Sequence, residues 1–472
     1  MNRLLISAAH KSSGKTTVSV GLCAALRARG ETVQPFKKGP DYIDPLWLGL
    51  AAGRSCYNLD AYLSGAEEIR AEVAKRMRGA TLGIVEGNKG LYDGLDLEGS
   101  NSNAALAVLL GTPVVLVLDA RGMTRGIAPL ILGYQAFDRN VRIAGVILNQ
   151  LGGSRHEAKL RAVISHYTGV PVLGAVQHDE RLTIVERHLG LVPSNEAEAA
   201  AARARVREIA SLVASQVDLD GLLAVARAAP PLAACAPTGG APARPGGPAV
   251  RVGVARDVAF GFYYPGDLEA LREAGAELVV FDALRDRRLP QLDGLFIGGG
   301  FPEMHMDALA RNAELRAELR MAIEAGLPAY AECGGLMYLA RSIEWNGRRA
   351  EMVGVIPADI VMHARPVGRG YVHLRETGRS PWSDASATRG GRICAHEFHY
   401  SSVENLPLDV EFAYEVERGH GIDGRHDGIV KKNMLASYSH LRDVAGNRWA
   451  RRFVDFVRHC RVNAAPAAAS LS

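Results

Sequence analysis

Short apolar runs alternate with amphipathic stretches along the first half of the chain. The apolar runs, which are rich in β-branched residues, cover 3–7, 82–86, 113–119, 143–148 and 170–175, and helix-like stretches cover 17–29, 66–78 and 155–166. These runs lack strict alternation of apolar and polar residues, as strands buried on both faces do. Since helical stretches separate them, we predict a parallel sheet with helices on both faces.

The second half repeats this pattern at first and then departs from it. Strands are predicted at 250–255, 277–281, 294–297 and 329–331, with helices at 265–274 and 314–325. From about residue 354 onward, strand-like and turn-like segments follow one another too closely to be put in order. Both halves are therefore predicted to be α/β layers.

Ala, Pro and Gly make up nearly all of residues 228–248. Such a segment can neither bury a core nor continue a helix, so we interpret it as a linker. The expected organisation is an N-terminal domain over 1–227, a linker over 228–248 and a C-terminal domain over 249–462. Residues 463–472, which are mostly Ala and Ser, are expected to form a flexible tail.

Composition narrows the class of protein. Of 472 residues 48% are hydrophobic, which is enough apolar surface to exclude intrinsic disorder of the whole chain. The formal net charge of +4 is spread along the chain and argues against nucleic acid as a partner. No apolar run approaches the roughly 18 residues of a membrane span, and the first residues do not resemble a signal peptide. The six cysteines form no CxxC pair, so neither zinc nor a disulfide framework is indicated, and we expect a cytoplasmic protein.

A phosphate-binding loop is predicted directly after the first strand. The segment AHKSSGKT at 9–16 follows the Walker A pattern, except that Ala9 replaces its first glycine. In this motif Gly14 lets backbone N–H groups approach phosphate, Lys15 supplies a positive charge and Thr16 a hydroxyl for Mg²⁺. Together with Thr17 they are the expected nucleotide-binding residues, and the alternative is an ordinary helix-capping turn.

Acidic and amide side chains end three other strands of the predicted sheet. Glu86 ends the run at 82–86 and is our candidate, with Thr16, for holding a metal, because ligands gather at the carboxyl ends of parallel strands. Asp119 and Asn149 occupy similar positions. Asp119 could equally be a solvent-exposed carboxylate without a role in binding. Asn149 could contact a nucleotide base or could equally be an ordinary turn residue.

Two polar, glycine-rich segments are expected to form ligand-binding loops. One is KKGPDYIDP at 37–45, which contains Asp41 and Tyr42, and the other is EGNKGLYDG at 86–94, which contains Asp93. Each combines turn residues with an acid and an aromatic ring, which suits a loop that binds something anionic and flat. Turn formation alone could also account for either segment.

The second half contains a candidate thiol nucleophile. In PAYAECGGLM at 328–337, a strand is followed by Cys333, Gly334, Gly335 and an apolar helix, which is the arrangement of a nucleophile elbow. A helix N-terminus favours the thiolate, and Gly334 lets a substrate carbonyl come close. Upstream, Gly299 and Gly300 end another strand and could present N–H groups to an oxyanion. The alternative is a buried structural cysteine.

Spacing alone does not identify the base that would activate this thiol. The candidates are His363, His373, His396, His399, His420, His426 and His440.

Seven motifs in one order along the chain resemble the cobyrinate a,c-diamide synthase family. They are SSGKTT, KGPDYIDP, EGxxGLYDG, GGGFPE, AECGGLMYL, HEFHYS and SYSHL, and they span nearly the whole chain. The resemblance implies an N-terminal P-loop domain similar to dethiobiotin synthetase. It also implies a C-terminal class I glutamine amidotransferase domain of the cobyrinate/cobyrate type.

The resemblance also implies a reaction. Cys333, activated by His440, would release ammonia from glutamine, and MgATP would phosphorylate a carboxylate of a tetrapyrrole in cobalamin biosynthesis. Ammonia would then displace phosphate from the acyl phosphate to leave an amide. The residues implied for MgATP and the macrocycle are Gly14, Lys15, Thr16, Thr17, Asp41, Tyr42, Glu86 and Asp93, and the glutamine pocket would include Gly299, Gly300 and Gly334.

Two departures from the family pattern leave alternatives open. Asn88 and Lys89 replace the usual residues before GLYDG, and this variant resembles a branch proposed to amidate sirohaem. Class I amidotransferases typically have a Cys-His-Glu triad with the Glu two residues after the His. Here Arg442 stands at that position, so the third member of the triad is not identified. A P-loop partitioning ATPase would fit the first half alone, and a plain glutaminase the second. A homodimer is also left open.

Overall fold

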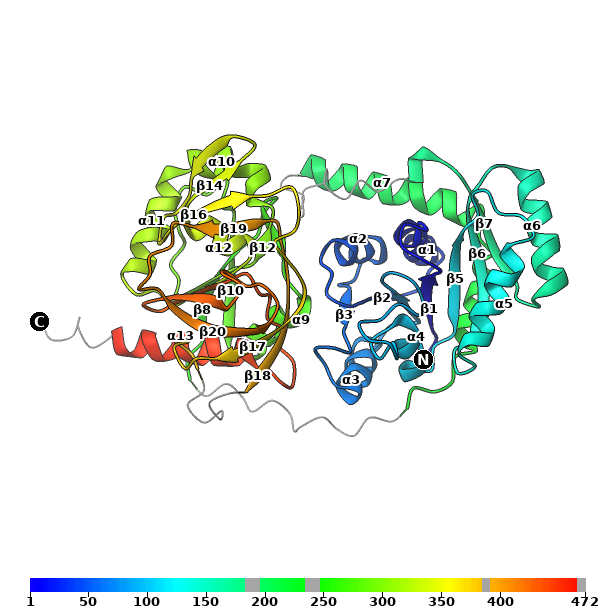
Figure 1. The fold of residues 1–472 in the computed structure, drawn as a ribbon, viewed down its shortest axis with the longest axis horizontal. Coiled ribbons are helices and arrows are strands. Elements are labelled where there is room, and N and C mark those ends of the chain that lie inside the picture. The colour runs from blue at the N-terminus through cyan, green and yellow to red at the C-terminus, as the bar shows by residue number, and fades with distance from the viewer. Residues whose placement is uncertain (183–195, 234–246, 384–390, 465–472) are drawn as a thin grey trace, which may run out of the picture. The chain divides into compact units, whose positions relative to one another are not determined.

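The computed structural model describes residues 1–182, 196–233, 247–383 and 391–464, and these form two compact units. The first unit contains the described residues up to 233 and the second those from 247 onward (Figure 1). Most of the predicted linker, residues 234–246, and the tail from 465 lie outside the described residues. The last helix, α13, runs to Ala464, two residues into the predicted tail. Within the described ranges no helix combines the length and apolar character that crossing a bilayer requires.

A seven-stranded parallel sheet forms the centre of the first unit, in the order β3-β2-β4-β1-β5-β6-β7. Its strands are β1 (Arg3–Ala8), β2 (Val33–Lys38), β3 (Tyr57–Leu59), β4 (Leu82–Glu86), β5 (Val114–Asp119), β6 (Ile143–Leu151) and β7 (Val172–Gln177). Its helices are α1 (Lys15–Ala28), α2 (Ile43–Ala52), α3 (Ala66–Arg76), α4 (Asn103–Leu110), α5 (Ile127–Phe137), α6 (Ser154–Tyr167), α7 (Glu196–Ala214) and α8 (Leu219–Arg227).

Successive residues of β1 enter two different cores. Leu4 and Ile6 pack with α1, α2, α7 and α8 on one face of the sheet, whereas Leu5 packs with α3 to α6 on the other. Side chains alternate between the faces of a strand, so an uninterrupted apolar run fills both cores. Figure 1 shows α1 on one side of the sheet and α5 and α6 on the other. The predicted two-sided parallel sheet is confirmed.

The second unit is built on a nine-stranded mixed sheet, in the order β10-β8-β11-β13-β22-β21-β20-β17-β18. The strands are β8 (Val250–Ala255), β10 (Ala276–Phe281), β11 (Gly294–Ile297), β13 (Ala329–Glu332), β17 (Gly368–Glu376), β18 (Arg392–His399), β20 (Glu411–Arg418), β21 (His426–Lys431) and β22 (Met434–Ser437). The first five strands in this order are parallel, and the remaining pairs are antiparallel.

Two smaller sheets and several helices complete the second unit. A short sheet pairs β9 (Phe260–Phe262) with β12 (Gly299–Gly300), and the other contains β14 (Ala340–Trp345), β15 (Arg348–Glu351), β16 (Ile356–Met362) and β19 (Ser401–Glu404). The helices are α9 (Pro265–Glu273), α10 (Met306–Arg311), α11 (Ala313–Glu324), α12 (Gly334–Leu339) and α13 (Trp449–Ala464). Residues of β11 again alternate between two cores, with Leu295 and Ile297 in one and Phe296 in the other.

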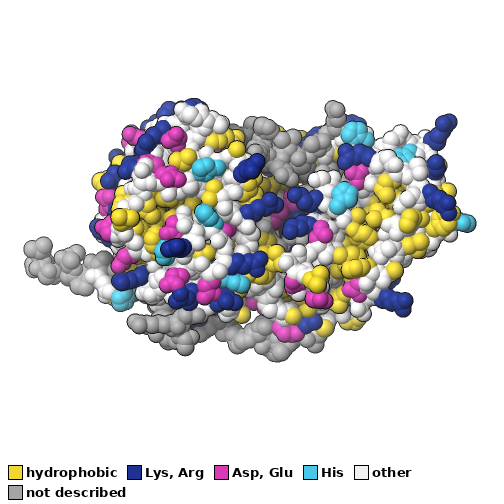
Figure 2. Space-filling model, in the orientation of Figure 1, with side chains coloured by type: hydrophobic (Ala, Val, Ile, Leu, Met, Phe, Trp, Pro, Cys, Tyr) yellow, Lys and Arg dark blue, Asp and Glu magenta, His cyan; other side chains and the backbone are white. Residues whose placement is uncertain are grey.

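Both units are α/β, as predicted. The predicted strands and helices are present, with ends shifted by up to three residues. The antiparallel strands after residue 354 are the part that the sequence pattern did not order. On the face drawn in Figure 2, basic and acidic side chains are interspersed and do not form a stripe of one sign.

Candidate nucleotide and glutamine sites

The loop between β1 and α1 has the geometry of a phosphate-binding loop. Gly14 has the left-handed φ of 78°, and a Cβ added there would lie 2.1 Å from Nδ2 of Asn149. Asn149, near the end of β6, donates from Nδ2 to the carbonyl oxygen of Ser13 at 2.8 Å. The amide therefore holds the loop against the sheet, a role that neither sequence-based interpretation of Asn149 had included. Asp119 pairs with the neighbouring Arg121.

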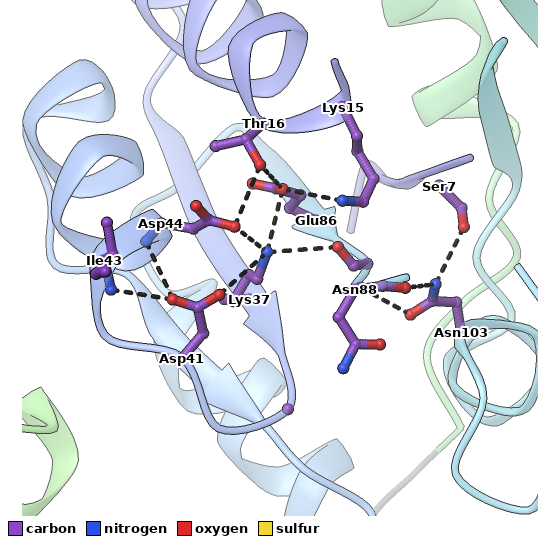
Figure 3. A network of polar contacts seen from close by, with 12 residues as sticks. Ser7, Lys15, Thr16, Lys37, Asp41, Ile43, Asp44, Glu86, Asn88 and Asn103 are labelled. Atoms are coloured by element: carbon purple, nitrogen blue, oxygen red, sulfur yellow. Dashed lines mark hydrogen bonds and ion pairs between the residues drawn. The ribbon is translucent and has the colours of Figure 1, made fainter. Parts of the chain in front are cut away.

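Beside this loop, a buried lysine that the sequence analysis did not single out joins three carboxylates (Figure 3). Lys37, at the end of β2, has a side chain only 2% exposed. Its Nζ lies 3.1 Å from Oε1 of Glu86 and 3.6 Å from Oδ2 of Asp41, and it also donates to Asp44. Buried charges need such partners, so the three acids hold the ammonium group in place.

The P-loop residues reach the same carboxylate. Thr16 donates from Oγ1 to Oε1 of Glu86 at 2.8 Å, and Nζ of Lys15 lies 3.4 Å from that oxygen. Glu86 is fully buried at the carboxyl end of β4, next to β1 in the sheet. Lys15, Thr16 and Glu86 are thus brought together as expected from adjacent parallel strands. Thr17 is half-buried in the first turn of α1.

The sequence predicted a loop over the whole of 37–45, but only its middle residues form one. Its first two residues end β2 and its last three begin α2, because Oδ1 of Asp41 accepts hydrogen bonds from the N–H groups of Ile43 and Asp44 at 3.0 and 3.1 Å. This cap starts the helix and turns Asp44 toward Lys37. Tyr42 is the half-buried residue just before the helix.

Charge interactions in this cluster outweigh the effect of burial. Burial alone would lower the pKa of Lys37, but Glu86, Asp44 and Asp41 raise it well above its usual value. Burial would raise the pKa of Asp44, yet Lys37 lowers it. Two members follow burial instead: burial lowers the pKa of Lys15, and burial with the charge of Asp44 raises the pKa of Asp41 to about 7. Lys37 therefore keeps its proton at neutral pH, and Asp41 is the acid that titrates there.

The donors around Glu86 fit a magnesium ion. Oε2 of Glu86 is buried and has no hydrogen-bond partner among the described residues, while Thr16 offers a hydroxyl oxygen next to it. The described ranges contain no cluster of three or more His, Cys, Asp or Glu side chains that could enclose a metal. Magnesium typically uses one or two carboxylates together with substrate phosphates, so an open pair of oxygen ligands suits it.

Asp93 is engaged in its own turn. Its Oδ2 accepts a hydrogen bond from the N–H group of Gly90 at 2.9 Å. A Cβ on Gly90 would lie 2.6 Å from the carbonyl oxygen of Ala9, so this loop packs directly on the P-loop. Asp93 thus shapes the turn that packs on the P-loop.

Replacing Lys37 by methionine should destabilise the first unit. The variant leaves Asp41, Asp44 and Glu86 close together without the ammonium group that balances them, and breaking a buried ion pair typically costs about 3–5 kcal/mol. Chemical denaturation of the full chain would measure the loss as a lower midpoint for the first unit. The double variant Lys37→Met with Asp44→Asn should recover part of it, and an unchanged midpoint for Lys37→Met would contradict the assignment of this network.

Cys333 lies at a strained turn between β13 and α12. Its backbone has φ 47° and ψ −103°, a conformation that non-glycine residues avoid, and its N–H group donates to the carbonyl oxygen of Ser437 at 2.7 Å. Such strain is typical of a nucleophile elbow. The residue is 6% exposed, and its Sγ lies 3.9 Å from the carbonyl oxygen of Phe398.

His440 is the histidine that contacts this thiol. Strands β13 and β22 pair in parallel, with Glu332 opposite Ser437, so the residues after both strands leave the sheet at the same edge. Burial would lower the pKa of His440, but hydrogen bonds to Cys333 and Glu332 raise it to about 10. At neutral pH the ring is therefore expected to carry the proton.

The predicted glycines surround this pair. A Cβ on Gly299 would lie 2.7 Å from Cε1 of His440, and one on Gly334 would lie 2.8 Å from the backbone nitrogen of Gly300. The two glycine segments approach each other this closely only because they lack side chains. Cys333, His440 and these three glycines therefore lie together in the second unit.

Two other candidate histidines, His396 and His399, lie close to Cys333 and His440, and their rings stack on neighbouring rings. His396 is stacked on His440 with ring centroids 4.9 Å apart, and burial holds its pKa well below the usual value. His399 is stacked on Tyr438 at 3.7 Å. His363 and His426 bond to Ser402 and Asp423.

Comparison with known proteins identifies both units. Residues 5–192 match the CobQ/CobB/MinD/ParA nucleotide binding domain, and residues 251–446 match the CobB/CobQ-like glutamine amidotransferase domain. The cobyrinate a,c-diamide synthase of Magnetococcus marinus is 49% identical over 97% of both chains. The chain belongs to the cobyrinate a,c-diamide synthase family. Further members are those of Methanosarcina acetivorans (40% identical, covering 98% of this chain and 97% of the relative) and Archaeoglobus fulgidus (41%, covering 96% of each).

Membership of this family confirms the predicted resemblance, and the protein is a glutamine-dependent ligase with a nucleotide-binding domain. Because the relatives match along nearly their whole length, the first unit is accounted for as part of a two-domain ligase. A partitioning ATPase would leave the second unit unexplained.

In a ligase of this family, a methyl group at Gly299 should impair glutamine use. The added Cβ would displace the His440 ring, because it would lie 2.7 Å from Cε1, and proton transfer depends on the position of that ring. We expect Gly299→Ala to lower glutamine-dependent activity by about 10²-fold, measured against ammonia-dependent activity of the same sample. Gly266→Ala is the matched control, since a Cβ there meets nothing within 4 Å. Equal activities of the two variants would contradict the placement of Gly299.

Proposed function

We propose that the protein amidates the a- and c-side-chain carboxylates of cobyrinate or hydrogenobyrinate in cobalamin biosynthesis. It would use ammonia from glutamine and the energy of MgATP. The observation that supports the proposal is the presence of two clusters of candidate site residues in one chain. One is the network of Lys15, Thr16, Lys37 and Glu86, and the other is the buried pair of Cys333 and His440. A glutaminase or an ATPase alone would need only one of them.

In the second unit, the thiolate of Cys333 would attack the carboxamide carbon of glutamine. The backbone N–H groups of Gly300 and Gly334 are the proposed donors to the oxyanion. His440, which holds a proton at neutral pH, would give it to the leaving nitrogen, so that ammonia departs and a glutamyl thioester remains. Water then hydrolyses the thioester, with His440 as the base, to return glutamate and the free thiol.

In the first unit, an oxygen of the substrate carboxylate would attack the γ-phosphorus of ATP and release ADP. Ammonia would attack the acyl carbon of the resulting acyl phosphate and displace inorganic phosphate, leaving an amide. Lys15 and the N–H groups around Gly14 would hold the phosphates, and Lys37 would offset charge near Glu86. Mg²⁺ held by Thr16 and Glu86 would supply charge neutralisation at the phosphates. Asp41 and Tyr42 are proposed to face the macrocycle.

The candidate macrocycles differ in the carboxylates that they offer for amidation. Two lysines near the proposed site, Lys38 and Lys89, could contact such carboxylates. Lys38 is 4% exposed, and burial together with the charges of Lys89 and Lys37 lowers its pKa to about 8, against the opposing effect of Asp60. Lys89 is exposed and has a left-handed φ of 42°. These lysines suit a substrate with several carboxylates, a property that cobyrinate and sirohaem share.

The test offers cobyrinate, hydrogenobyrinate and sirohaem separately with MgATP and glutamine, and mass spectrometry counts the acids converted to amides. Two amidations of a corrinoid would support the proposal. Amidation of sirohaem alone would move the protein to another macrocycle with the same chemistry. We also propose a cytoplasmic location and leave a homodimer as the assembly to test by sedimentation.

The acyl phosphate has its own test. With substrate whose carboxylates carry ¹⁸O, one labelled oxygen should appear in inorganic phosphate for each amide formed, because that oxygen leaves with the phosphoryl group. Phosphate without label, at full amide yield, would refute this step.

A further inference from the structure

Glu332, the residue before the nucleophile, has a carboxylate beside His440. Oε2 of Glu332 lies 3.4 Å from Nδ1 of His440, and both side chains are less than 5% exposed. The other oxygen, Oε1, accepts a hydrogen bond from the hydroxyl of Tyr330 at 2.6 Å and one from the N–H group of Leu441 at 2.8 Å. The carboxylate is therefore fixed on two sides, and its free oxygen faces the imidazole.

We propose that Glu332 is the positioning residue that orients His440, so that Glu332, His440 and Cys333 act as a triad. This inference rests on the proposed glutamine hydrolysis and adds to it a residue that the sequence did not indicate. Glu332 holds a proton on Nδ1, which leaves Nε2 for the thiol of Cys333. The imidazolium that gives its proton to the leaving nitrogen is then balanced by a buried carboxylate.

Two consecutive residues can contact the same ring because of the turn between them. Along a regular strand, neighbouring side chains point to opposite faces. The φ of 47° at Cys333 reverses the chain after β13, so that the thiol and the Glu332 carboxylate both reach His440. Leu441 is next to His440, and its N–H bond to Glu332 ties carboxylate and imidazole together.

Neighbouring elements confine the ring further. Residues 396 and 440 exchange backbone hydrogen bonds, and the His396 ring is stacked on one face of His440 at an interplanar angle of 15°. Gly299 lies at the edge that carries Cε1. The ring is thus held in its plane, and the carboxylate at Nδ1 directs Nε2 toward the thiol.

The nearby buried acids are engaged elsewhere. Asp427 accepts the N–H groups of Tyr438 and Ser439 at 3.0 and 2.9 Å, so it holds the backbone before His440. Glu397 accepts the N–H groups of His420 and Gly421 and lies 3.8 Å from His399. The ionisable groups around the pair include Arg442, which lies over the Tyr264 ring and 3.6 Å from Asp267. The others are Tyr330, His396, Tyr263, Asp267, Tyr414 and Tyr438.

The test compares Glu332→Gln with Tyr330→Phe in the full chain. Glutamine has nearly the same shape, and its amide oxygen can still accept a hydrogen bond from Nδ1, but it has no charge to balance the imidazolium. We expect glutaminase kcat to fall by about 10²-fold or more in Glu332→Gln. Tyr330→Phe, which removes a different bond to the same carboxylate, should lose much less. Ammonia-dependent amidation by each variant reports whether the first unit still works.

A second readout separates orientation from stability. The rate at which iodoacetamide alkylates Cys333 should follow a thiolate titration, and its midpoint should rise in Glu332→Gln because the imidazolium partner is weakened. Glutaminase and alkylation profiles within twofold of the wild type would overturn the proposal. If the wild-type enzyme itself did not use glutamine to amidate any of the macrocycles, the proposed function would be refuted, and not the role of Glu332.

A measurement on the wild type covers the case in which Glu332→Gln does not fold. In protein labelled with ¹⁵N-histidine, the His440 ring is assigned by its loss in His440→Ala. A proton bound to Nδ1 of this ring is the expected result, and an unprotonated Nδ1 throughout the active pH range would overturn the proposal.

Discussion

Cys333→Ser is expected to abolish glutamine-dependent amidation while amidation with ammonium salts continues. A serine hydroxyl stays protonated beside an imidazole that can hold a thiolate, so we expect a loss of about 10³-fold or more, of the order seen when nucleophiles of hydrolytic triads are removed. The chemistry at Lys15 and Glu86 does not use the thiol. The measurement is amide formation with glutamine and, separately, with ammonium chloride at pH 8.5.

The matched control for this variant is Cys460→Ser. Cys460 lies on α13 and its Sγ accepts a hydrogen bond from Asn433 at 3.8 Å, without a role in the proposed reaction. This control should keep both activities. If Cys333→Ser retained glutamine use at the wild-type rate, the thiol would not be the nucleophile and another source of ammonia would have to be sought.

Lys15→Met should have the opposite pattern, with loss of amidation from both glutamine and ammonia. Lys15 is 12% exposed at the first position of α1, where a helix N-terminus and an ammonium group together bind phosphate. Removing one such positive group from a phosphoryl-transfer site should cost about 10²–10³-fold in kcat. The measurement is formation of ADP and amide under saturating ammonia.

Lys159→Met, an exposed lysine on α6, is the control for a lost positive charge. It should leave amidation unchanged. Full amidation by Lys15→Met would show that the P-loop does not bind the nucleotide that drives the reaction.

The nucleotide site could be predicted from the sequence where its residues follow a local pattern. Gly14, Lys15 and Thr16 form a contiguous motif, and Glu86 ends a strand that the sequence identifies to the residue. Lys37 and Asp44 were missed because their segment was interpreted as a ligand-binding loop. They meet only when Asp41 caps α2 and the helix turns Asp44 back toward the end of β2. A lysine at the end of a buried strand was the signal available.

The glutamine site was less accessible to sequence reasoning. Selecting His440 among seven histidines needs the pairing of β13 with β22, a contact between residues about one hundred positions apart. The acid was sought after the histidine, whereas Glu332 comes before the cysteine. On an ordinary strand it would point away from that cysteine's side. The sequence does not reveal the backbone reversal that brings both side chains to one ring.

That reversal has an evolutionary consequence. The backbone at Cys333 is one that glycine adopts readily and other residues adopt at a cost of about 1–3 kcal/mol. Selection for a stable fold alone would favour glycine at this position, so a cysteine is kept there only while its chemistry is needed. In lineages where a duplicated copy of this domain no longer processes glutamine, position 333 should be among the first to change, and the change should make the copy more heat-resistant.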